Sequence, residues 1–199
     1  RYRKTPLLLI MKIRLNVPYY SQLDNSEYTD LGNYIAAGSS QCNPTSVTMA
    51  LVYLYPNFLK ESQEQKYKEP ESYLNSKLIH YGYVTDHNAV TQCLKAEFNI
   101  NSEWRNNLTK QDLIAQLDKN IPVPIGMKYK SSGHICCLVG YDSEFNTFEL
   151  HDPYGVRYGS EDYYDVGANG AYDKYSMKLM NQVFWDLGSN AGHGRLFYL

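Results

Sequence analysis

The sequence predicts an α+β fold in which a helical half is followed by an antiparallel sheet. Before residue 120, apolar residues recur at helical spacing in several segments. The later segments are short, rich in Val, Ile, Leu, Phe and Tyr, and separated by turns. Helices first and strands later are typical of α+β domains. We therefore expect a helical lobe and a sheet lobe with a cleft between them.

Hydrophobic spacing places the helices. The first is expected to begin near Cys42, because Pro44 suits the first helical turn and apolar residues then recur at helical spacing until Pro56. Thr109 and Asp112 resemble a capping box, which marks the start of another helix. Further helices are expected at residues 70–81, 86–98, 109–119 and 177–187, with a solvated helix or loop at 60–69. Strands are expected at residues 13–20, 122–129, 134–141, 147–150 and 195–198.

Composition predicts a single folded domain. The chain has 199 residues and 43% hydrophobic content, enough to bury a core. Its 19 Lys and Arg against 21 Asp and Glu give a net charge of -2, with no basic stripe, so nucleic acid is not an expected partner. No run approaches the roughly 18 apolar residues of a membrane helix, so no transmembrane segment is expected. The sequence carries no signal of oligomeric state.

We divide the chain into residues 1–10 and one domain over residues 11–199. The first segment has basic residues and leads into a short apolar patch, too short for a signal peptide and without a small-residue cleavage site. We interpret it as a leader, an expression scar or upstream sequence. Four cysteines at this length do not make a disulfide scaffold, which favours a reducing compartment. The protein is therefore expected in the cytoplasm.

Cys42 is the candidate nucleophile. It lies in the run Ser40–Ser46, a loop that turns directly into an apolar-periodic helix. Unpaired N–H groups and the positive dipole end at a helix N-terminus favour the thiolate form of a cysteine. By contrast, Cys93 lies in a helical apolar pattern, and Cys136 and Cys137 are adjacent in an apolar strand. These three are expected to be ordinary buried thiols.

His134 and Asp152 are the candidate partners of this thiol. His134 opens one predicted strand and Asp152 closes the next. A hairpin centred near residue 144 places Asp152 opposite residues 134–136, where direct or diagonal neighbours contact each other. Asp152 would orient the imidazole, and His134 would accept the thiol proton. Because two serines and a glycine precede His134, we expect it at an exposed cleft rim.

A zinc hydrolase is the alternative chemistry at this hairpin. His134, His151 and Asp152 are metal-ligand types, but adjacent strand residues point to opposite faces, so His151 should diverge from Asp152. The other histidines show no second ligand pair at a zinc spacing. We expect neither a metal nor another cofactor.

Four ordered blocks resemble the bacteriocin-processing-peptidase-like branch of papain-fold cysteine peptidases, a double-glycine leader peptidase-like family. The blocks are Val17–Gln22, Cys42–Ser46, Gly133–Ile135 with Val139–Tyr141, and Asp152–Gly155. They span about residues 15–157, which is most of the domain. The resemblance implies a papain-like fold with Cys42 as nucleophile, His134 as general base and acid, and Asp152 as the orienting carboxylate.

The resemblance also implies Gln22 as the side-chain donor of the oxyanion hole. In papain-type sequences this glutamine usually precedes the cysteine by a few residues, so we predict an insertion at Asn25–Ser39. Gln41 is the competing amide, although its adjacency to Cys42 favours a side chain that points away. Asn43 stands where relatives often have glycine.

These observations predict a cysteine peptidase that hydrolyses an amide bond through a thioester. Double-glycine leader peptidases are fused to a transporter, whereas a stand-alone domain suggests a cytosolic peptidase or a phage-type lysin that is released to act on peptidoglycan cross-peptides at the cell wall. The 20 tyrosines, many of them within 154–175, form either a ligand surface or a loop packed with its own rings. The alternatives are a papain-fold binding module with little turnover and a thiol-dependent deamidase or acyltransferase.

Overall fold

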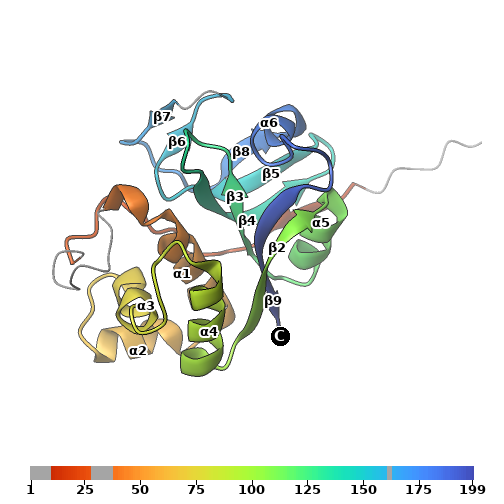
Figure 1. Ribbon diagram of the computed structural model, residues 1–199. Helices are drawn as coiled ribbons and strands as arrows, with labels where there is room; N and C mark the ends of the chain where they lie inside the picture. Colours follow the sequence, from red (N-terminus) through yellow and green to blue (C-terminus); the bar gives the residue numbers. More distant parts are fainter. Residues whose placement is uncertain (1–9, 28–37, 161–162) are drawn as a thin grey trace, which may run out of the picture.

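The computed structural model describes residues 10–27, 38–160 and 163–199 (Figure 1). Figure 1 shows helices α1 to α4 gathered on one side of the molecule and the large sheet on the other. The predicted α+β fold, helical lobe before antiparallel sheet, is confirmed. Of the predicted segment 1–10, only the exposed Ile10 lies within the described residues.

The helical lobe is built around one buried helix. Its elements are the 3-10 turn η2 (Gly38–Ser40) and helices α1 (Cys42–Leu54), α2 (Phe58–Glu64), α3 (Pro70–Leu78) and α4 (His87–Phe98). Every side chain of α1 from Asn43 to Leu51 is buried, because α3 packs on one side and strand β4 (His134–Asp142) on the other. A helix in this position has no solvated stripe, although Asn43, Thr45, Ser46 and Thr48 within it are polar. None of the described helices is long and apolar enough to cross a bilayer.

The sheet lobe is a seven-stranded antiparallel sheet with the order β2-β9-β3-β4-β5-β8, while β1 also pairs with β4. Its strands are β1 (Lys12–Arg14), β2 (Asn101–Leu108), β3 (Val123–Met127), β4, β5 (Thr147–His151), β8 (Asp173–Ser176) and β9 (Gly192–Tyr198). Helices α5 (Lys110–Asp118) and α6 (Met177–Val183) complete the lobe, and strands β6 (Val156–Arg157) and β7 (Tyr164–Asp165) form a separate two-stranded sheet.

The hairpin of β4 and β5 has the predicted register. Asp142 pairs with Thr147 and Cys137 pairs with His151, with one bulge between Leu138 and Gly140. Continuing this register places Asp152, just beyond β5, opposite Cys136. His134 lies on the same face as Cys136, because side chains two residues apart share a face of a strand.

The strands differ from the sequence prediction in several places. Strands β6, β7 and β8 lie within residues 156–176, where no strand was expected. Strand β2 was not expected, because its sequence Asn-Ser-Glu-Trp-Arg-Asn-Asn-Leu is mostly polar; it lies at the sheet edge, with Leu108 its one fully buried residue. Strand β1 ends at Arg14 rather than near residue 20. Beyond Leu15, whose N–H still bonds the Val139 carbonyl, the chain leaves the sheet and runs to the cleft, where the Gln22 N–H donates to the Pro153 carbonyl.

The capping box at the start of α5 is confirmed. The Thr109 hydroxyl accepts from the Asp112 N–H, and the Asp112 carboxylate accepts from the Thr109 N–H. We expect Thr109→Ala to lower the free energy of unfolding by about 1 kcal/mol, because it leaves a helix N–H without its partner. Urea denaturation measures the loss. Ser160→Ala, at an exposed loop position, is the control; equal stability of the two variants would contradict the assignment.

Candidate active site

Cys42 is the first residue of α1 and carries a free, partly buried thiol. Its position places the sulfur at the end of the helix where backbone N–H groups lack intrahelical partners. The preceding Gln41 makes no side-chain bond to these groups. The sequence prediction of a thiol at a helix N-terminus therefore holds.

His134 and Asp152 meet as the hairpin register predicted. His134 Nε2 lies 2.7 Å from Asp152 Oδ1, although the two residues are 18 positions apart in the chain. Because an ionised carboxylate only accepts hydrogen bonds, Nε2 carries the proton of this pair. The other ring nitrogen, Nδ1, is therefore the one that can accept a proton from the thiol.

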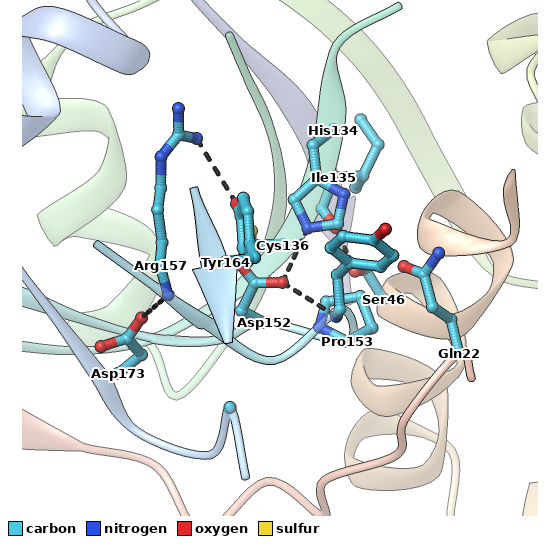
Figure 2. A network of polar contacts seen from close by, with 12 residues as sticks. Gln22, Ser46, His134, Ile135, Cys136, Asp152, Pro153, Arg157, Tyr164 and Asp173 are labelled. Atoms are coloured by element: carbon cyan, nitrogen blue, oxygen red, sulfur yellow. Dashed lines mark hydrogen bonds and ion pairs between the residues drawn. The ribbon is translucent and has the colours of Figure 1, made fainter. Parts of the chain in front are cut away.

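Asp152 is fully buried and accepts four hydrogen bonds. Figure 2 shows the one from His134. Oδ1 also accepts from the Tyr154 N–H at 2.9 Å. Oδ2 accepts from the Cys136 thiol at 3.2 Å and from the Tyr175 hydroxyl at 3.1 Å. Burial raises the pKa of Cys136 to about 12 and that of Tyr175 well above its usual value, so both groups keep the proton that they donate. Sequence reasoning missed both residues.

The carboxylate stays ionised in spite of its burial. Burial raises the pKa of Asp152, but the charge and hydrogen bond of His134, with the Tyr154 N–H and the Cys136 thiol, bring it below the usual value. This is the behaviour expected when several donors stabilise the charged form.

His134 is buried, with only 5% of its surface exposed. The prediction that His134 lies exposed at the rim of a cleft is therefore wrong. Three tyrosine rings surround the imidazole edge-on, with centroids 5.6 to 5.9 Å away: Tyr129, Tyr154 and Tyr164. These rings exclude water from the His134–Asp152 pair, which strengthens its electrostatic interaction.

His134 favours the charged form of Cys42. Burial raises the pKa of the Cys42 thiol, but the hydrogen bond and charge of His134 outweigh it, so the pKa lies below its usual value. Burial lowers the pKa of His134, but the charge of Asp152 raises it well above the usual value. The two directions favour a thiolate beside an imidazolium.

A hydrogen bond across the two lobes aligns this pair. The Ser46 hydroxyl, one helical turn after Cys42, donates to the Ile135 carbonyl at 3.0 Å. Residues four apart lie on the same face of a helix. The bond therefore fixes the Cys42 face of α1 against the start of β4, next to His134.

Gln22 reaches the cleft from the segment after β1. Its side chain is fully buried, and its Nε2 donates to the Gly38 carbonyl at 2.7 Å. This contact joins the chain just before the predicted insertion Asn25–Ser39 to the end of that insertion. Residues 28–37 lie outside the described residues. Asn25 secures this segment by donating to Glu71 and Ser72 of α3.

Gln41 points away from the cleft. Its Oε1 accepts from Asn75 Nδ2 at 2.8 Å, inside the helical lobe. Asn43, at the position where relatives often have glycine, donates through Nδ2 to the Val84 carbonyl at 2.6 Å. Both side chains thus hold the start of α1 to neighbouring helical segments.

His151 lies on the opposite face of β5 and is structural. Its Nε2 donates to the Val17 carbonyl at 2.8 Å, and its Nδ1 accepts from the Tyr172 N–H at 3.0 Å. His151 is therefore not close enough to His134 and Asp152 to complete the alternative zinc site. Among the described residues, the three potential ligands that cluster are His134, Cys136 and Asp152. Their mutual hydrogen bonds already occupy these ligand atoms.

Two cavities meet at Cys42 and His134. One, of about 190 Å³, extends to Trp104 and His193. The other, of about 290 Å³, extends to Tyr129 and Tyr154. The reacting pair thus lies between two spaces that can each take part of an extended ligand.

A sequence profile of the Peptidase_C39 like family matches residues 14–179. The chain belongs to this family. The match includes the four blocks on which the sequence resemblance rested, which confirms that resemblance. Membership makes the protein a relative of the bacteriocin-processing cysteine peptidases, with a helical lobe that carries the cysteine and a sheet lobe that carries the histidine.

A solved structure shows the same fold. The crystal structure of a candidate C39-like peptidase from Bacillus anthracis matches with a TM-score of 0.53 and 14% sequence identity. The similarity covers 95% of this chain and 98% of that chain. At this identity the likeness concerns the fold alone. A search of curated proteins found no match to the chain.

The pKa directions predict a bell-shaped pH dependence of kcat/KM. Activity should rise as Cys42 loses its proton, below the usual thiol pKa, and fall as His134 loses its proton, above the usual imidazole pKa. Asp152→Asn removes the charge that raises the pKa of His134, so the alkaline limb should move to lower pH. The rate of Cys42 alkylation against pH measures the acid limb alone, because alkylation follows the thiolate. Asp118→Asn, on the exposed end of α5, is the control; an unmoved alkaline limb in Asp152→Asn would contradict the assignment.

Proposed function

We propose that the protein is a cysteine peptidase that hydrolyses an amide bond through a thioester on Cys42. The observation that carries this proposal is a thiol at a helix N-terminus in one cleft with an imidazole whose far nitrogen is held by a buried carboxylate. The lowered pKa of Cys42 and the raised pKa of His134 are the directions that such a nucleophile needs.

The geometry supports the following sequence of steps. His134 Nδ1 takes the thiol proton, and the Cys42 sulfur attacks the substrate carbonyl carbon. The oxyanion that forms is stabilised by the Cys42 backbone N–H and by Gln22. His134 then protonates the leaving amine as the C–N bond breaks, which leaves a thioester. Water, deprotonated by His134, attacks the thioester; the acid leaves and the thiol regains its proton.

Cleavage within a peptide fits this cleft better than deamidation of a side chain. A deamidase releases ammonia and needs space on one side of the scissile bond. Here cavities adjoin both sides of the reacting pair, one toward Tyr129 and the other toward Trp104. Pockets on both sides are what an endopeptidase uses to hold the acyl and amine parts of its substrate.

We propose peptidoglycan cross-peptides as the substrate class of this peptidase. On this proposal the enzyme is made in the cytoplasm and acts at the cell wall after its release. The support is the tyrosine-rich segment 154–175. Tyr154 and Tyr164 form the wall around His134, whereas Tyr158 and Tyr163 are 52% and 65% exposed and pair with each other. Exposed aromatic rings suit contact with sugar rings.

Alkylation tests the activated nucleophile directly. At neutral pH, iodoacetamide should label Cys42 much faster than the other three cysteines, which are fully buried and whose thiol pKa values burial raises. Cys42→Ala should release no product from peptide libraries or from purified peptidoglycan, with new termini identified by mass spectrometry. Equal labelling of all four thiols would contradict the proposal and leave a papain-fold binding module. Product release from peptide libraries but not from peptidoglycan would remove the cross-peptide substrate alone.

Gln22 and Gln41 form a matched pair for testing the oxyanion hole. Gln22→Ala should lower kcat by about 100- to 1000-fold, because it removes one donor to the oxyanion. Gln41→Ala loses a contact to Asn75 within the helical lobe, so it should lower stability while kcat changes little. Iodoacetamide labelling of Cys42 should persist in both variants. A larger loss of kcat in Gln41→Ala than in Gln22→Ala would reverse the assignment.

A further inference from the structure

The cavity on the Trp104 side of Cys42 has an aromatic wall drawn from three separate elements. His87 of α4 stacks on Trp104 of β2, with ring centroids 3.5 Å apart and planes 5° from parallel. His193 of β9 lies 5.8 Å from the same indole. All three line the space that opens beside Cys42. The wall is therefore a product of tertiary packing next to the reacting atoms.

A glycine in β3 makes room for this wall. A Cβ at Gly126 would lie 2.2 Å from the His193 ring, closer than packed atoms approach. Gly126 pairs with Ile135, the residue after His134, so it lies beside the catalytic strand. The absence of a side chain at this one position lets the imidazole lie against the strand.

The wall is electrically neutral. Burial, helped by the charges of Arg195 and His193, lowers the pKa of His87 to about 4. Burial also lowers the pKa of His193. No Lys, Arg, Asp or Glu lines the cavity among the residues that the structure describes. Both imidazoles are therefore uncharged at neutral pH.

A buried cation lies behind the wall. Arg195 is fully buried and donates to the His87 carbonyl at 2.8 Å and to the hydroxyls of Thr91 and Ser102. These acceptors are all neutral. The guanidinium charge therefore adds a positive potential at the back of the wall, which disfavours a second cation in the cavity.

From these observations we propose that the cavity bounded by His87, Trp104 and His193 is a substrate subsite that selects a planar, uncharged side chain, such as a carboxamide or a phenol. Such a group stacks against the aromatic wall. This inference rests on the proposed peptidase activity and specifies which residue that activity prefers beside the scissile bond.

Other side chains fit the lining less well. A lysine or arginine would meet the potential of Arg195 without a carboxylate to pair with. A carboxylate would lose its hydration in a cavity whose lining has no charged side chain to pair with it. An aliphatic side chain has no flat face to stack on the indole.

Cleavage-site profiling tests the subsite. The wild type is first incubated with a peptide library to locate the scissile bond, and each flanking position is then changed to Gln, Tyr, Glu or Lys. At one position, kcat/KM for Gln and Tyr should exceed that for Glu and Lys by about tenfold or more. Trp104→Ala should remove this preference, as should Gly126→Ala, whose methyl group displaces the His193 ring.

The matched control is Phe145→Ala, which removes an exposed aromatic ring from the turn between β4 and β5, at the far end of the hairpin from His134. Its preference should equal that of the wild type. Thermal unfolding and iodoacetamide labelling of Cys42 show that Trp104→Ala and Gly126→Ala keep the fold and the activated thiol.

The outcomes separate the two proposals. Cleavage that depends on Cys42, with the same preference in wild type and Trp104→Ala, would overturn the subsite and leave the peptidase. A preference for Lys or Glu would also overturn it. If the wild type cleaves no peptide and its Cys42 is labelled no faster than the buried thiols, the peptidase proposal fails and the subsite fails with it.

Discussion

The buried hydrogen bond between His134 and Asp152 is the interaction on which the rest of the site depends. An ionised carboxylate with no exposed surface is costly unless donors surround it. Here four donors do so: the His134 ring, the Tyr154 N–H, the Cys136 thiol and the Tyr175 hydroxyl. These bonds keep the negative charge in place, and that charge raises the pKa of His134 and indirectly holds Cys42 as a thiolate.

The two lobes are joined next to this charge. Ser46 of α1 bonds the Ile135 carbonyl of β4, and the Gln22 N–H bonds the Pro153 carbonyl just after Asp152. One bond aligns the helix that carries the thiol, and the other positions the amide that we propose for the oxyanion hole. Since both anchor points are neighbours of His134 and Asp152, the same few residues of the hairpin set the position of every reacting group.

The cleft that results has two chemically different ends. Tyrosine rings and Lys130 line one end, whereas the other has a neutral indole and imidazole wall in front of a buried Arg195. Family membership assigns the cysteine peptidase framework but says nothing about these walls. Substrate choice therefore resides in side chains outside the reacting triad.

Local patterns determined the start of α1 at Cys42, the capping box of α5 and the hairpin register that brings Asp152 to His134, because helical spacing, capping and strand pairing act between residues close in sequence. Tertiary packing decided the burial of His134, the roles of Cys136, Ser46 and Tyr175, and the edge strand β2 with Trp104. Each of these depends on contacts between segments far apart in the chain. The sequence contains the residues for such contacts, but only the folded chain determines which of them meet.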